Sequence, residues 1–72
     1  MPKLYSSSHI IKVLVRKGFN FISQRGSHTK YRKQSGKFTY TAIVPVSRKE
    51  IPYGTFRSIL RQSHLQEKDF ER

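Results

Sequence analysis

The chain has no cysteine, only four acidic residues and no long apolar run. The lack of cysteine excludes disulfides and thiolate metal sites, and it fits a reducing compartment. The most hydrophobic stretch, residues 10–15, is interrupted by Lys12 and is too short for a membrane span or the core of a signal peptide. We therefore expect a soluble, cytoplasmic protein that does not bind a membrane.

The charge that is present is almost entirely positive. Fifteen lysines and arginines stand against four acids, a formal net charge of +11, and the first acid in the chain is Glu50. Such a balance predicts a polyanionic partner, and nucleic acid is the usual one. We expect the 72 residues to form a single domain, 1–72, too small to enclose a deep pocket. An open site that holds a polymer is the better interpretation.

Apolar spacing and turn residues predict the order of elements. A first helix should begin after Ser6, as its N-cap, and end at Gly18. Aromatic and β-branched residues predict strands over 19–24, 28–33 and 38–44, separated by turns at 26–27 and 34–37. Pro52 can open a second helix over 52–62, and one or two further helical turns are expected around 65–70. For His9 and His64, near helix ends, we expect no role beyond capping or solvent exposure.

The predicted order is helix, three antiparallel strands, helix and a short C-terminal helix. This is an α+β fold in which two helices cover one face of a meander and leave the other face open. Double-stranded-RNA-binding domains have such a layout.

Residues 26–31 carry the clearest chemistry, because a turn there leads into a strand that begins at His28. Alternation places the side chains of His28, Lys30 and Arg32 on one face of that strand, over about 13 Å at ~3.3 Å per residue. Histidine is the residue best suited to move a proton at neutral pH, and cations beside it suit a phosphate. The simpler interpretation is a hairpin turn followed by an exposed polar residue without a task. The candidate RNA contacts are Arg25, Gly26, Ser27, Lys30, Arg32 and Lys33.

Four segments carry a resemblance to a known family: 17–19 (KGF) after a serine-led helix, 24–28 (QRGSH), 44–45 (VP) and 54–60 (GTFRSIL). In this order and spacing the chain resembles, over nearly its whole length, the HicA toxins of bacterial type II toxin-antitoxin systems, also called the YcfA-like family. The resemblance implies a double-stranded-RNA-binding-like fold, endonuclease activity on messenger RNA, and inhibition by an antitoxin of the HicB type. His28 matches the family's catalytic histidine. The family often has another histidine where Val46 and Ser47 stand here.

The residues and the resemblance lead to the same expected mechanism. His28 can take the proton from a ribose 2′-hydroxyl, which then attacks the adjacent phosphate, while Lys30 and Arg32 offset the charge on the phosphoryl oxygens. This scheme requires no metal and no cofactor. The alternative is an RNA-binding module of the double-stranded-RNA-binding type without catalysis, which the same charge and fold would support.

Overall fold

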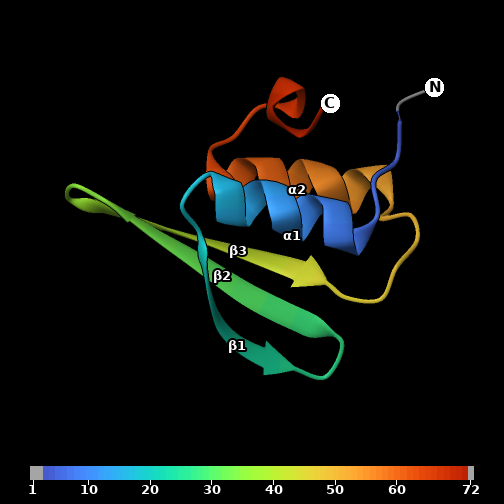
Figure 1. Cartoon of the computed structure of the whole chain (residues 1–72), viewed down its shortest axis with the longest axis horizontal. Helices are drawn as coiled ribbons and strands as arrows, with labels where there is room; N and C mark the ends of the chain where they lie inside the picture. Colours follow the sequence, from blue (N-terminus) through green and yellow to red (C-terminus); the bar gives the residue numbers. More distant parts are fainter. Residues whose placement is uncertain (1–2, 72) are drawn as a thin grey trace.

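In the computed structural model, which describes residues 3–71, two helices lie on one side of a three-stranded antiparallel sheet (Figure 1). The elements in chain order are α1 (Ser7–Arg16), β1 (Asn20–Arg25), β2 (His28–Ser35), β3 (Phe38–Pro45), α2 (Tyr53–Ser63) and a 3-10 helix, η1 (Glu67–Phe70). This confirms the predicted α+β layout of the double-stranded-RNA-binding type. The short C-terminal helix is a 3-10 turn. No helix within residues 3–71 is long and apolar enough to cross a membrane.

The first helix begins and ends at the predicted signals. Ser6 is the N-cap, and its hydroxyl accepts the backbone N–H of His9 at 3.1 Å. Gly18 follows the last turn with a φ of +102°, a conformation that other residues adopt only with strain. A Cβ at Gly18 would lie 3.3 Å from Cε of the flexible Lys33 side chain, which can move aside, so the backbone conformation is the reason for glycine at this bend.

The sheet register shows which face the helices cover. Thr29 and Tyr31 of β2 lie opposite Val44 and Ala42 of β3, and all four are buried. Because side chains alternate along a strand, the neighbouring residues of β2 point away from the helices. His28 therefore lies on the open face of the sheet, which the sequence alone did not establish.

The C-terminal turn packs into the core through Phe70. Its side chain is fully buried and meets the Phe56 ring edge-on, with 5.1 Å between ring centroids. The His9 Nε2 atom hydrogen-bonds the Phe70 carbonyl at 2.6 Å, and the His9 ring stacks on Tyr5. The expectation that His9 does no more than cap a helix or face solvent was wrong, because its imidazole joins α1 to the chain terminus.

Acidic side chains hold η1 against the rest of the chain. Lys17 Nζ lies 3.5 Å from Asp69 Oδ1, and the Tyr53 hydroxyl donates to Glu67 at 2.7 Å. The backbone N–H of Gln66, with a smaller contribution from Lys17, lowers the pKa of Asp69 below its ordinary value. Three of the four acids of the chain lie at or after Glu67. No acid occurs in residues 20–45, so the charged side chains on the open face of the sheet are all cations.

Candidate functional site

The turn between β1 and β2 places His28. Gly26 has a φ of +58°, and the Gln24 side chain donates to the Gly26 carbonyl at 2.9 Å. Arg25 and His28 flank this turn as direct partners in the register, and both are exposed. Directly opposite residues of an antiparallel pair share a face. The guanidinium of Arg25 therefore lies on the same side of the sheet as the imidazole.

The same turn is tied to the start of α1 through the loop that follows β3. The backbone N–H of Val46 donates to the Ser27 carbonyl at 2.8 Å. Buried Ser7 donates its hydroxyl to the Pro45 carbonyl at 2.7 Å and accepts the N–H of Arg48 at 3.1 Å. The backbone groups of Ser7 and Arg48 also bond directly, at 2.9 Å. His28 therefore stands on a turn that two other segments hold in place.

Ser7 is the residue of this assembly that sequence reasoning missed. Its only signal was a run of three serines, Ser6 to Ser8, where a cap requires one.

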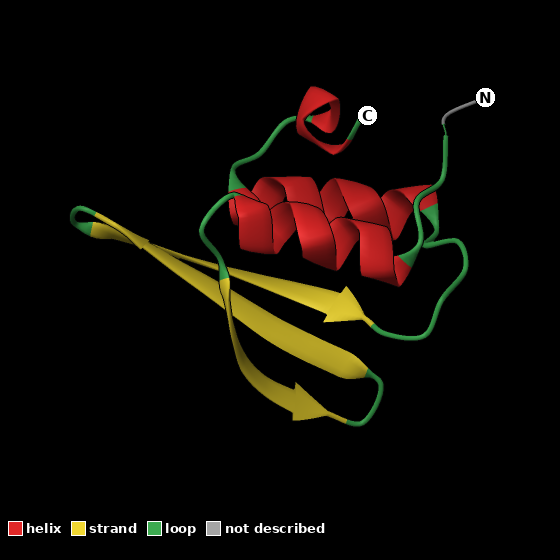
Figure 2. Ribbon diagram, in the orientation of Figure 1, coloured by secondary structure: helices red, strands yellow, loops and turns green. Residues whose placement is uncertain are grey.

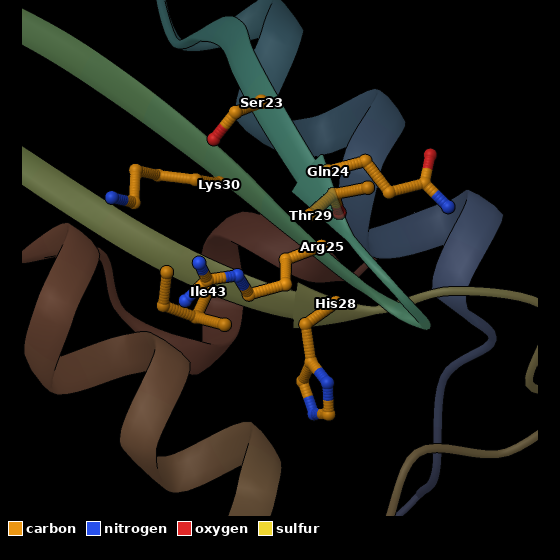
Figure 3. Close-up of a pocket in the computed structure, with 7 residues that line it drawn as sticks. All are labelled: Ser23, Gln24, Arg25, His28, Thr29, Lys30 and Ile43. Atoms are coloured by element: carbon orange, nitrogen blue, oxygen red, sulfur yellow. The ribbon is translucent and has the colours of Figure 1, made fainter.

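The side chains around His28 line an open hollow of about 690 Å³ on the sheet surface (Figure 3). Its cations come from two strands, Arg25 from β1 and Lys30 from β2, and Lys30 lies opposite Ile43 of β3. The lining residues are Ser23, Gln24, Arg25, His28, Thr29, Lys30 and Ile43. No acid is among them, so the hollow favours an anion.

The imidazole of His28 has no partner within the part of the chain that the structure describes. None of the hydrogen bonds among residues 3–71 uses its ring nitrogens. The side chain is exposed at the edge of the hollow, and Figure 3 shows it pointing away from the strands. Such a ring can accept or donate a proton to a bound molecule without first breaking a contact within the protein.

The structure brings most of the predicted RNA contacts together and separates one. Arg32 continues the open face beyond Lys30, and its Nε donates to the Thr41 hydroxyl at 3.4 Å. Gly26 and Ser27 form the turn itself. Lys33 lies on the other side of the sheet, where its side chain passes Gly18. Within residues 3–71 no three His, Asp or Glu side chains are grouped so that they could hold a metal ion.

A comparison with protein families matches residues 7–65 to the family described as the HicA toxin of bacterial toxin-antitoxin. The chain belongs to this family. The matched range contains both helices, the whole sheet and His28, whereas η1 of this HicA family member lies outside it. A search of curated proteins gave no match to the chain. Membership of a toxin family in toxin-antitoxin systems, predicted from the segments above, is thereby confirmed.

Proposed function

We propose that this HicA family member is a metal-independent endoribonuclease that cleaves messenger RNA and so inhibits translation and growth. We propose further that His28 is its catalytic residue and that an acidic antitoxin of the HicB type neutralises it. The observation that carries the proposal is the unpartnered, exposed imidazole of His28 in a cationic hollow without acids. The open face of the sheet admits a polymer, which an enclosed pocket would not.

The chemistry follows from the groups around the hollow. The neutral imidazole of His28 takes the proton from a ribose 2′-hydroxyl, and the 2′-oxygen forms a bond to the adjacent phosphorus. The bond from phosphorus to the 5′-oxygen breaks, and that oxygen takes a proton from the imidazolium or from water. The products are a 2′,3′-cyclic phosphate and a 5′-hydroxyl. Arg25 and Lys30, which line the hollow, offset the charge that builds up on the phosphoryl oxygens, and Arg32, further along the open face, contacts a neighbouring phosphate of the same strand.

The proposed chemistry depends on one titratable group, so the enzyme should be slow. General base catalysis contributes roughly 10²- to 10⁴-fold, and one well-placed donor contributes about as much. The loop after β3 is hydrogen-bonded to the turn before His28, through Val46 and Ser27, but valine and serine occupy positions 46 and 47. No second histidine assists His28 from those two positions.

RNA affinity should depend strongly on salt, because the cations of the open face replace the counterions of the phosphates. Each phosphate bound on a single strand contributes roughly −0.7 to the slope of log affinity against log salt. With about four phosphates bound, we expect a slope of about −3. Replacing Lys30 and Arg32 together by Ala should lower both the affinity and the slope, to about −1.5. A filter-binding salt series measures both quantities.

The matched control is the pair Arg57→Ala and Arg61→Ala, which removes the same charge from exposed positions of α2. This α2 variant should bind RNA more tightly than the variant that lacks Lys30 and Arg32. The slope of its log affinity against log salt should equal that of the wild type. If the RNA affinity of the wild type did not change with salt, or if the two double variants lost equal affinity, the open face would not be the RNA-binding surface.

The proposed antitoxin should cover His28, because nothing within residues 3–71 shields the hollow and its lining has no acid. Complementary charge should make association fast and sensitive to salt. A histidine-modifying reagent, read out by mass spectrometry, should modify His28 in the free toxin and leave it unmodified in the complex. His64 is also exposed, so its modification in the same sample shows that the reagent is active and gives a reference for the modification of His28. A tight complex in which His28 keeps its full reactivity would exclude direct masking.

A further inference from the structure

The hairpin of β2 and β3 projects well past the ends of both helices (Figures 1 and 2). It also projects past β1, which pairs with β2 only as far as Arg32. From Lys33 to Ser35, β2 pairs with β3 alone. This end of the sheet is therefore two strands wide, and one edge of β2 is free.

An aromatic row lies on the helix side of this projecting end, and we define it as Phe38, Tyr40 and His64. The rings of Phe38 and Tyr40 are nearly parallel, with 6.4 Å between centroids and 10° between planes. The imidazole of His64 also packs against Tyr40, with 4.4 Å between ring centroids and a tilt of 38° between the planes. Phe38 is 65% exposed, more than any other large apolar side chain that the structure describes. The row thus ends in a flat, accessible ring face that the core does not use.

Cations border the row, and acids are absent from the hairpin. Lys33 lies directly opposite Tyr40 in the register, and Lys37 stands in the turn before Phe38. No aspartate or glutamate occurs between residues 28 and 45. His64 has a φ of +60° at the helix end, where glycine is the usual residue, and its position there brings the imidazole onto Tyr40.

We propose that the aromatic row is a second RNA-binding site, which stacks an unpaired base of the same strand that is cut at His28. This inference rests on the proposed function. Stacking of bases on aromatic rings beside cations is how proteins hold single-stranded nucleic acid without reading its sequence. Phe38 supplies the stacking face, and Lys33 and Lys37 supply charge for the flanking phosphates. A docked protein would need a broader apolar patch than three rings between lysines.

The dimensions of the hairpin allow one strand to reach both sites. Seven residue steps separate His28 from Ser35, which pairs with Phe38. At ~3.3 Å per residue this is about 23 Å along β2. The RNA must also pass from the open face to the helix side, and the free edge of β2 beyond Arg32 permits this, since the two strands there are only about 5 Å apart. RNA that extends several nucleotides beyond the cut should therefore bind more tightly than RNA that fills only the hollow.

The test compares two RNAs that carry a 2′-O-methyl group at the cut position, one of about 4 and one of about 12 nucleotides. For the wild type the longer RNA should bind more tightly. Phe38→Ala should weaken binding of the longer RNA by roughly 5- to 100-fold, as expected for loss of one stacked base, and remove most of the advantage of length. In a series of longer RNAs, each carries 2-aminopurine at a different position. At a single position distant from the cut, the fluorescence of the 2-aminopurine should fall when the RNA binds the wild type. It should not fall when the RNA binds Phe38→Ala.

Two substitutions at the same position separate stacking from simple apolar contact. Phe38→Tyr keeps the ring and should bind as the wild type does, whereas Phe38→Leu keeps apolar volume and should bind as Phe38→Ala does. Val15→Ala removes an exposed apolar side chain from α1 and should change nothing.

Unchanged affinity of Phe38→Ala for the longer RNA, with cleavage by the wild type intact, would overturn this inference and leave the proposed function standing. Loss of antitoxin binding alone would instead identify the row as a protein-docking surface. A wild-type protein that bound neither RNA would overturn both proposals.

Discussion

RNA cleavage and growth arrest should disappear in a His28→Ala variant, whereas the fold and most of the RNA affinity should remain. The rate should fall by roughly 10²- to 10⁴-fold, because the variant loses the imidazole that we propose takes the proton from the 2′-hydroxyl. Stability should change by no more than about 0.5 kcal/mol, since the side chain is exposed and has no hydrogen bond within residues 3–71. Turnover of a labelled RNA, thermal unfolding and filter binding measure the three effects separately.

A second substitution at this position distinguishes proton transfer from binding. His28→Gln keeps a polar side chain of similar size that can hydrogen-bond a phosphate but cannot act as a base at neutral pH. It should bind RNA as well as the wild type and remain inactive. If either purified variant cut RNA as fast as the wild type, the protein would be an RNA-binding module without catalysis, and His28 an ordinary residue beside a turn.

Loss of the Phe70 ring should destabilise the whole domain, although the residue lies outside the range that matches the family. Phe70→Ala should lower the free energy of unfolding by about 3–5 kcal/mol, because the side chain is fully buried against Phe56 and close to Tyr5. Small domains have only about 5–15 kcal/mol in total. At about 4–8 °C per kcal/mol, Tm should fall by more than about 10 °C.

Lys68→Ala is the matched control for this prediction, since it changes an exposed residue of the same 3-10 turn. It should shift stability by less than about 0.5 kcal/mol. Similar small changes in both variants would mean that η1 does not contribute to the core. A chain that ends at residue 65 should fold poorly, even though it contains the entire match to the family.

The features that sequence reasoning predicted correctly depend on local patterns. The serine cap, the glycine that ends α1 and the alternation along β2 each involve residues a few positions apart, where spacing fixes geometry. Alternation could place His28, Lys30 and Arg32 on one face, but it could not say that the helices cover the other. Alternation also separates Lys33 from that face.

The features that were missed join distant parts of the chain. The bond from His9 to Phe70 spans 61 positions, and that from Arg48 to Ser7 spans 41. The sequence around His9 has no pattern that distinguishes it from other histidines near a helix start. The same is true of Ser7 among serines near a helix start. Alternation places Phe38 and Tyr40 on one face, but the parallel arrangement of their rings and the contact with His64 depend on packing, including how α2 ends against the hairpin. Such contacts are set by packing, which single-sequence patterns do not encode.

The central claim is that the 2′-hydroxyl of the RNA is the nucleophile and that His28 removes its proton. Analysis of the 3′ ends of the fragments by mass spectrometry tests this claim most directly, with purified wild-type protein and EDTA in the reaction. We expect a 2′,3′-cyclic phosphate or a 3′-phosphate, 5′-hydroxyl ends on the other fragment, and no cleavage of RNA with a 2′-deoxy sugar at the cut position. A 3′-hydroxyl, or cleavage that stops in EDTA, would contradict the claim and indicate metal-assisted hydrolysis.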